Sequence, residues 1–202
     1  MVRLAISVEG PTEERFIQRV MVPYLQDRDI YAVPLLLGRH GGDVSLPRVK
    51  KELNHLASSF DKVTTLYDFY GFRGKGKDEN KASLEQKIVD SVAAPLRERI
   101  IPYVQMYEFE GLLFSSPEAI ENNIQQSGLA TWAHDVLQKF SNDPEKINDS
   151  QQTAPSKRLE KQSNYIKTVH GPNIANEIGL DVLRDRCSGF GSWLDKLEAL
   201  QG

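Results

Sequence analysis

The first half of the chain alternates short segments of strand-like pattern with longer segments of helix-like pattern. Apolar residues occupy every second position from Val2 to Val8, which predicts a strand, and the turn residues 9–11 end it. Apolar residues then recur at helical spacing, which predicts an amphipathic helix with Thr12 as its N-terminal cap. The apolar stripe of this helix consists of Phe16, Ile17, Val20, Met21, Tyr24 and Leu25.

Three more strands and two more helices are expected before residue 113. The strands should cover residues 30–37, 63–67 and 100–107, and the helices residues 47–58 and about 84–96. Pro34 cannot donate a backbone hydrogen bond, so the second strand should lie at a sheet edge or contain a bulge. Strands that alternate with helical crossovers predict an α/β fold, with a mostly parallel four-stranded sheet and helices on both faces. Such sheets bind ligands at the carboxyl ends of their strands.

Helical patterns dominate after residue 113. We expect helices over residues 117–126, 129–140 and 157–168, with a polar connection over 141–156. A last helix carries a single apolar stripe, which consists of Phe190, Trp193, Leu194, Leu197 and Leu200. The chain is therefore expected to have an α/β core at residues 1–113 and a helical C-terminal elaboration at 114–202, packed together as a single structural unit.

Composition narrows the class of protein. The chain has 202 residues with 28 acidic and 25 basic side chains, and 40% of its residues are hydrophobic, which suits a folded domain. A single cysteine, Cys187, excludes a disulfide framework and a multi-cysteine zinc site. No apolar segment has the length of a membrane span, and the N-terminus lacks the pattern of a signal peptide. We therefore expect a cytoplasmic protein with no membrane partner.

Carboxylates follow three of the four predicted strands. Glu9 follows the first strand, Asp68 the third, and Glu108 and Glu110 the fourth, while Glu13 lies one helical turn beyond Glu9. If residues 108–110 are extended, both of their glutamates lie on one face. Carboxylates that converge repel one another unless a cation neutralises them, and hard oxygen ligands favour Mg²⁺ or Mn²⁺. The alternative is that each acid caps a helix or lies in a solvated turn.

Two basic segments could supply the phosphate contacts that a carboxylate cluster lacks. Residues 73–81 contain four basic and two acidic side chains, and residues 157–167 contain four basic and one acidic. The glycine-containing loop at 38–42 lacks the Gly-Lys-Ser/Thr ending of a P-loop, so we expect no nucleotide hydrolysis by this chain alone. The alternative is that these are solvated charged loops. The candidate nucleic-acid contacts are Arg39, Arg73, Lys75, Lys77, Lys157 and Arg158.

Four short runs carry a resemblance to a known family: Val8–Glu13, Tyr67–Phe72, Tyr107–Phe114 and Pro155–Leu159. The acids after the first, third and fourth strands occupy positions that resemble those of the TOPRIM fold, which topoisomerases, primases and overcoming-lysogenization-defect nucleases share. More closely, the four runs resemble a family of small stand-alone TOPRIM-like proteins of undefined function, often encoded beside ATPases of the ABC or structural-maintenance type.

The resemblance implies a role for each matching residue. Glu9 would be a metal ligand or a general acid and base, and Asp68 matches the first acid of an Asp-x-Asp motif. Tyr70 stands at the position of the second acid and cannot replace it, which leaves open whether one or two metal ions bind. The resemblance and the strand-end and charge patterns together predict Glu9, Lys157 and Arg158 as catalytic residues. They predict Glu9, Glu13, Asp68, Glu108 and Glu110 as ligands of Mg²⁺ (or Mn²⁺).

These expectations lead to two functions. The first is a metal-dependent nuclease that cleaves DNA or RNA, an effector of a phage-defence system that a partner ATPase controls. The second is a non-catalytic TOPRIM-like subunit that interacts with an ATPase or regulates it. A third and weaker alternative is phosphoryl chemistry on small phosphorylated substrates. The sequence leaves self-association of the chain open.

Overall fold

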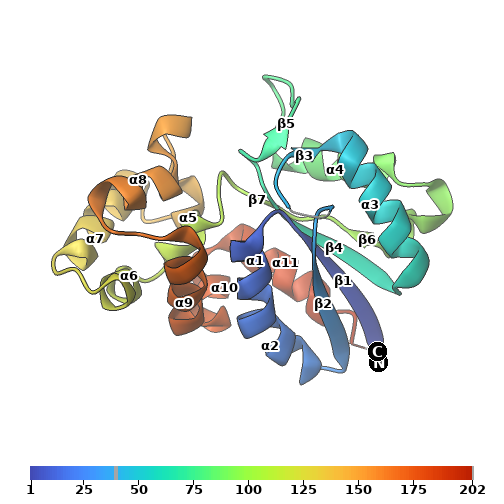
Figure 1. The fold of residues 1–202 in the computed structure, drawn as a ribbon, viewed down its shortest axis with the longest axis horizontal. Coiled ribbons are helices and arrows are strands. Elements are labelled where there is room, and N and C mark those ends of the chain that lie inside the picture. The colour runs from blue at the N-terminus through green and yellow to red at the C-terminus, as the bar shows by residue number, and fades with distance from the viewer. Residues whose placement is uncertain (39–40, 202) are drawn as a thin grey trace.

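A parallel sheet forms the centre of the molecule (Figure 1). The structure is a computed structural model that describes residues 1–38 and 41–201. Strand β1 (Val2–Val8) pairs in parallel with β2 (Ile30–Leu36) on one side and with β4 (Lys62–Asp68) on the other. Strand β2 ends the sheet order, so the edge position expected from Pro34 is confirmed. The carboxyl ends of β1 and β4 consequently lie next to each other.

The predicted fourth strand is broken into two short strands. Strands β6 (Ile100–Ile101) and β7 (Val104–Gln105) both pair in parallel with β4, which makes a five-stranded sheet. Pro102 lies at the break and has no N–H to donate. The Thr65 hydroxyl spans the break, because it accepts a hydrogen bond from Tyr103 N (2.9 Å) and donates one to Tyr103 O (2.8 Å).

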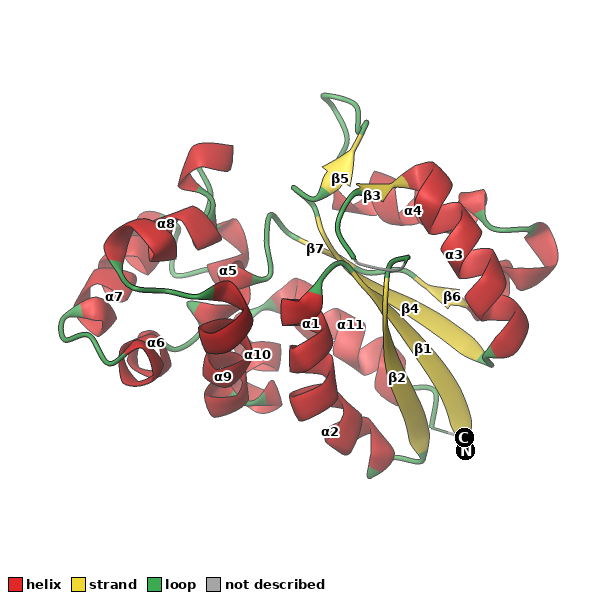
Figure 2. Ribbon diagram, in the orientation of Figure 1, coloured by secondary structure: helices red, strands yellow, loops and turns green. Residues whose placement is uncertain are grey.

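Helices cover both faces of the sheet, which gives the mixed α/β architecture drawn in Figure 2. Leu4 and Ile6 point into one apolar cluster and Ala5 into the other, as alternation along a strand requires. The first cluster includes residues of the contiguous helical segments α1 (Pro11–Phe16), η1 (Ile17–Met21) and α2 (Val22–Gln26) and of α11 (Ser188–Glu198). The second includes residues of α3 (Leu46–Ser59) and α4 (Lys81–Ser91).

The start of the first helix differs from the expectation. Gly10 is the N-cap residue of α1 and Pro11 follows it, so Thr12 lies inside the helix and is not its cap. The proline explains the shift, because its fixed φ and missing N–H suit the first turn of a helix.

Short helices form the other half of the molecule, on the left of Figure 1. The segment predicted as one helix over 157–168 is two helices, α8 (Pro155–Gln162) and α9 (Lys167–Ile178), separated by residues 163–166. No helix within the described residues is long and apolar enough to cross a membrane. The elements are α5 (Glu110–Leu113), α6 (Pro117–Ile124), α7 (Leu129–Lys139), η3 (Pro144–Lys146), η4 (Gln151–Thr153), α8 (Pro155–Gln162), α9 (Lys167–Ile178) and α10 (Leu180–Arg186).

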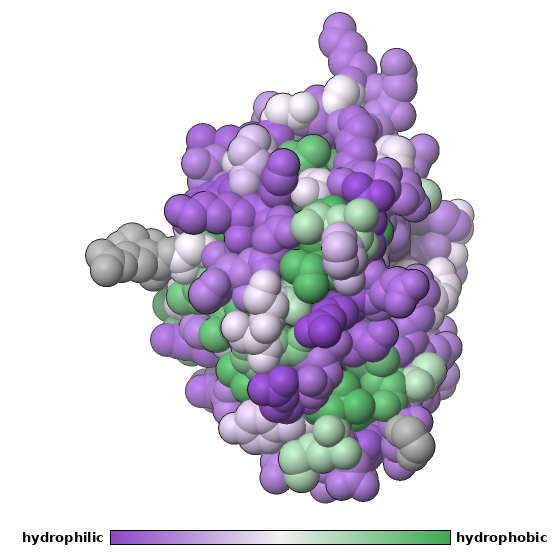
Figure 3. Space-filling view, turned by 90° about the vertical axis from the view of Figure 1, so that its right-hand side faces the viewer, coloured by the Kyte–Doolittle hydropathy of each residue, from purple (hydrophilic) through white to green (hydrophobic). Residues whose placement is uncertain are grey.

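A small second sheet projects beside the strand ends. Strands β3 (Val44–Ser45) and β5 (Phe72–Arg73) pair in parallel, and η2 (Ala94–Arg99) connects α4 to β6. The projection at the top of Figure 3 is hydrophilic, in agreement with the basic loop that follows β5.

The last helix returns to the sheet and completes its core. Trp193 in α11 stacks on Tyr103 with ring centroids 4.5 Å apart and an interplanar angle of 7°. The Trp193 Nε1 group donates a hydrogen bond of 2.8 Å to the Thr64 hydroxyl of β4. Trp193 is only 1% exposed. Residues more than 120 positions apart in sequence are therefore parts of one core.

We expect Trp193→Ala to lower the free energy of unfolding by about 3–5 kcal/mol, because it leaves a large cavity at the sheet. Urea denaturation measures the loss. Trp132→Ala is the matched control, because Trp132 is only partly buried and should cost clearly less. Equal losses for the two variants would contradict the central role of Trp193.

Candidate metal site at the strand ends

Acidic side chains from separate elements meet at the carboxyl end of the sheet. Glu9 follows β1, Asp68 ends β4 and Glu13 lies in the first turn of α1. All three line a cavity of about 340 Å³, together with Lys167 from the start of α9. The fold thus brings together three of the five predicted metal ligands in one cleft, which we call the acidic cleft.

The backbone around Glu9 is packed closely against it. The Glu9 carboxylate accepts a hydrogen bond of 3.2 Å from Asp68 N, and Glu9 O accepts one of 2.6 Å from Gly42 N. A Cβ atom at Gly71 would overlap both carboxylate oxygens of Glu9. The absence of a side chain at Gly71 therefore allows the turn after β4 to approach the Glu9 carboxylate.

Burial raises the pKa of each carboxyl group that lines this cleft. Burial raises the pKa of Asp68 well above its ordinary value, and the nearby Glu9 and Glu13 raise it further. The pKa values of Glu9 and Glu13 are also raised, chiefly by burial, although Lys167 opposes the shift. Asp68 keeps one strong partner, because its Oδ1 accepts a hydrogen bond of 2.8 Å from Phe109 N. The cleft therefore favours protons or cations.

The chain between β7 and α5 turns sharply instead of continuing as a strand. Tyr107 has a φ of +60°, a left-handed conformation, and its carbonyl accepts a hydrogen bond of 3.0 Å from Tyr70 N. Helix α5 then begins at Glu110. The extended geometry that would place Glu108 and Glu110 on one face is therefore absent, and that expectation is wrong.

Glu108 is engaged at the start of another helix. Its Oε2 accepts a hydrogen bond of 2.9 Å from Ser156 N, in the first turn of α8. The carboxylate thus satisfies one of the amides that a helix N-terminus leaves without an internal partner. Glu108 therefore attaches α8 to the other acids, as the alternative of a helix-capping acid predicts. We call the five carboxylates that influence one another here the acidic cluster: Glu9, Glu13, Asp68, Glu108 and Glu110.

Glu110 is completely buried and only partly satisfied. Its Oε1 lies 3.3 Å from Lys167 Nζ and 3.3 Å from the Tyr165 hydroxyl, which donates to it. Its Oε2 is buried and has no hydrogen-bond partner among the described residues. Burial raises the pKa of Glu110 to about 7, with Lys167 acting in the opposite direction.

Lys167 is the cation among these acids. Burial by itself would lower its pKa, but Glu110, Asp68, Glu108 and Glu13 together raise it well above the ordinary value. The sequence marks Lys167 only as a basic residue of the segment 157–167 and does not predict this position. Within the described residues, no three Asp, Glu, His or Cys side chains are arranged to hold a metal ion together. The ammonium group supplies positive charge to the cluster.

Tyr70, at the second acidic position of the motif, holds a different contact. Its hydroxyl donates a hydrogen bond of 2.7 Å to Asn148 Oδ1. Its ring lies 5.4 Å from that of Tyr107, measured between centroids. The side chain therefore ties the turn after β4 to the connection at 141–156 and supplies no carboxylate.

The predicted basic residues lie away from the acidic cleft. Arg73 pairs with Asp43 (2.9 Å), Lys75 donates to Phe72 O (3.0 Å), and Lys77 is exposed. Lys157 pairs with Glu160 and Arg158 with Asp149, each at 2.7 Å, and both line a separate cavity. None of these five lines the acidic cleft. Arg39 and His40 lie outside the described residues.

The fold and site define an α/β protein with buried carboxylates at the carboxyl ends of parallel strands. The chain belongs to the family described as a domain of unknown function, DUF4276, whose model matches residues 8–198. No curated protein matches the chain.

Solved structures similar to the chain include the C-terminal regions of two OLD proteins. The C-terminal region of the Burkholderia pseudomallei OLD protein is 13% identical over 100% of both chains, with a TM-score of 0.52. The C-terminal region of the Xanthomonas campestris pv. campestris OLD protein is 18% identical over 98% of this chain and 93% of that chain, with a TM-score of 0.47. The first likeness shows that the chain shares the fold of an OLD C-terminal region.

We expect Gly71→Ala to lower the free energy of unfolding by about 1–3 kcal/mol, because the added methyl group overlaps the Glu9 carboxylate. Gly76→Ala is the control, because the nearest neighbour of its Cβ would be Glu79 Oε2 at 3.7 Å. Urea denaturation compares the two variants. A Gly71→Ala protein as stable as the control would contradict the close approach.

Glu110 should make the stability of the protein depend on pH. Its pKa is about 7 in the folded chain and about 4.5 in the unfolded chain. The folded state thus holds the proton more tightly, so this contribution is complete below pH 4.5 and is lost as the pH rises through 7. With a chelator present, wild type should lose about 3 kcal/mol relative to Glu110→Gln between pH 4 and pH 8. A constant difference between the two denaturation curves would contradict the raised pKa.

Proposed function

We propose that the chain is a Mg²⁺- or Mn²⁺-dependent phosphodiester hydrolase of the TOPRIM type that acts on nucleic acid. One observation carries the proposal: Glu9, Glu13 and Asp68 line one cleft at the carboxyl ends of β1 and β4, and the pKa of each is raised by burial. Buried acids of this kind gather at functional sites. The fold shared with an OLD C-terminal region supports the same class of protein.

The donor set fits a hard divalent cation. Glu9, Glu13 and Asp68 offer carboxylate oxygens at one cleft, and Glu110 has a buried oxygen that lacks any partner among the described residues. Among the described residues no three such side chains are arranged around one point, so these carboxylates would have to move together to hold the ion. A bound ion of this kind activates a water molecule and neutralises charge on the phosphate.

The chain's own residues supply the remaining chemistry. If Glu13, Asp68 and Glu110 hold the ion, Glu9, which is partly accessible and has a raised pKa, suits a general base that accepts the proton of the attacking water. The Lys167 side chain is 41% exposed, so its ammonium group can contact a phosphate at the mouth of the cleft once a metal ion balances the carboxylates. An ammonium group is a compact charge with three donors, suited to the charge that develops on a scissile phosphate.

Control by an ABC or structural-maintenance ATPase in phage defence belongs to the same proposal. The chain has no P-loop of its own, so an energy-dependent trigger would come from a partner. The support for this step is the resemblance of the four sequence runs and the OLD-like fold.

We expect Glu9→Gln and Asp68→Asn each to reduce divalent-metal-dependent cleavage of nucleic acid by about 100-fold or more, because each removes a charge from the cleft. The assay incubates plasmid DNA and structured RNA with Mg²⁺ or Mn²⁺, with a chelator as blank. Glu14→Gln is the matched control, because Glu14 neighbours Glu13 in α1 but does not line the acidic cleft. The proposal is wrong if the wild-type protein cleaves neither substrate with either metal ion, alone or with a partner ATPase.

The second candidate is a non-catalytic subunit of an ATPase complex. The contact of 3.3 Å between Lys167 and Glu110 favours it, because the cluster already holds a positive charge without a metal ion. In this case Mn²⁺ does not bind in calorimetry, and a complex with the ATPase survives Glu9→Gln. In the nuclease, Mn²⁺ binds wild type and the substitution weakens that binding.

A further inference from the structure

A second cavity lies on the helical side of the molecule, between α7 and α8. Its volume is about 240 Å³. Lys157, Arg158 and Lys161 line it together with Trp132, Thr153 and two glutamines, and no carboxylate lines it. Lys157 and Arg158 are paired with Glu160 and Asp149, which lie outside the lining, whereas Lys161 forms no ion pair among the described residues, so its charge can attract an anion. We call this space the basic cavity.

Arg158 has a donor that the fold does not satisfy. Its Nη2 pairs with Asp149 Oδ2 at 2.7 Å, and its guanidinium group lies 5.1 Å from the centre of the Phe140 ring. These contacts hold a side chain that is only 17% exposed. Its Nε is buried and has no hydrogen-bond partner among the described residues. Such a donor is costly unless a ligand oxygen accepts from it, and phosphate oxygens suit a guanidinium group.

Trp132 adds an aromatic surface to this charged wall. It lies in α7, is partly buried, and packs on Phe114 at 5.7 Å between ring centroids. Cations beside a supported aromatic ring form the combination that binds a nucleic-acid strand, because the ring stacks on bases and the cations contact phosphates.

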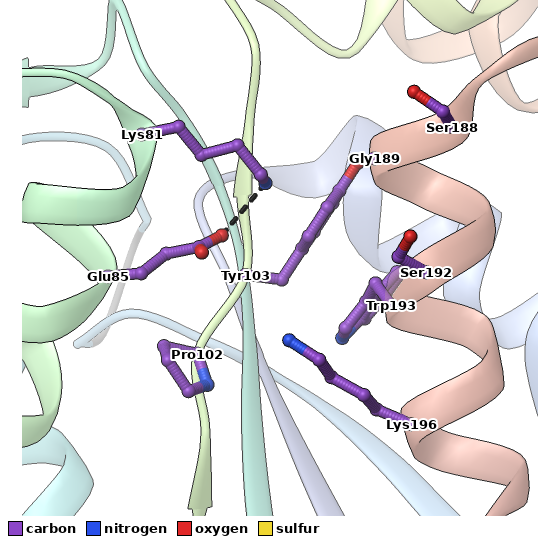
Figure 4. Close-up of a pocket in the computed structure, with 9 residues that line it drawn as sticks. All are labelled: Lys81, Glu85, Pro102, Tyr103, Ser188, Gly189, Ser192, Trp193 and Lys196. Atoms are coloured by element: carbon purple, nitrogen blue, oxygen red, sulfur yellow. Dashed lines mark ion pairs between the residues drawn. The ribbon is translucent and has the colours of Figure 1, made fainter.

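Another cavity with two lysines differs because a carboxylate, Glu85, is part of its lining (Figure 4). There the ammonium group of Lys81 pairs with Glu85 at 2.8 Å, donates to Val104 O and lies 3.8 Å from the Tyr103 ring centre. The tryptophan of that cavity, Trp193, is 1% exposed and stacked on Tyr103. Its cation and aromatic ring thus hold the fold together. Lys196, at its rim, provides a matched control for a loss of charge.

The basic cavity is connected to the acidic cluster through α8. Glu108 binds the amide of Ser156, and Lys157 is the next residue along the helix. Lys161 lies five residues beyond Ser156, about 7.5 Å along a helix axis. The contact with Glu108 and the basic cavity therefore lie on the same helix.

We propose that the basic cavity binds one nucleotide unit of a single-stranded nucleic acid, with the base against Trp132 and the phosphate at Arg158 and Lys161. The inference rests on the proposed function and deepens it, because it names a single strand as the form of nucleic acid that the chain holds. A duplex keeps its bases stacked and paired, so its bases cannot reach Trp132.

The test measures binding with a chelator present, so that cleavage plays no part. A fluorescein-labelled 12-nucleotide single strand, as DNA and as RNA, is titrated with the full chain and followed by anisotropy. Intrinsic tryptophan fluorescence is followed with the unlabelled strand. We expect quenching in wild type and weaker binding by the duplex. Lys161→Gln, Arg158→Gln and Trp132→Ala should each weaken binding about tenfold, and Lys196→Gln should not.

Several results would overturn the site. Lys161 is exposed, so Lys161→Gln should fold normally, and unchanged affinity in this variant contradicts the proposal. Equal affinity for the duplex and for the single strand also contradicts the proposal. Adenosine monophosphate that binds as tightly as the strand would assign the cavity to free nucleotides instead. Normal strand binding without any cleavage supports the cavity and overturns only the proposed nuclease.

Discussion

The balance of charge at the carboxyl end of the sheet is the constraint on which the rest of the structure depends. Asp68, Glu13 and Glu110 are buried there, and buried carboxylates repel one another and resist losing their water. Lys167 supplies a positive charge beside them. Since Lys167 begins α9, the helical half of the chain must pack where that ammonium group reaches the sheet.

The packing of α9 against α1 meets that requirement. Gly171 lies where a Cβ atom would be 3.1 Å from Thr12 and 2.9 Å from the Tyr165 hydroxyl, so a larger residue would require both side chains to shift. Tyr165 in turn donates a hydrogen bond to Glu110. Close packing and charge balance therefore depend on each other. The helices after residue 113 form part of the site, and α11 contributes Trp193 to the core of the sheet.

The two charged regions have different origins in the fold. The acidic cleft is built on strand ends, where parallel strands open toward ligands. The basic cavity is built on α7 and α8, and the contact between Glu108 and Ser156 connects it to the acids. A net charge of −3 describes neither region, because the total averages over surfaces of opposite sign. This separation is the physical basis for our proposals of a metal ion in the cleft and a phosphate in the cavity.

The local sequence pattern was enough to predict the strands β1, β2 and β4 and most helices. It also predicted that Glu9 and Asp68 lie close together, because parallel pairing brings the carboxyl ends of neighbouring strands to the same edge of the sheet. The pattern did not predict the positions of Glu108 and Glu110, because the left-handed turn at Tyr107 and a four-residue helix leave no periodic signal in the sequence. The position of Lys167 could not be predicted either. Its partners lie 57 or more positions away in sequence, and only the packing of α9 decides which charges it meets. The sequence by itself thus determined the elements and the acids at their ends, whereas the tertiary structure decided which charges neutralise them, because electrostatic contacts depend on distance in space.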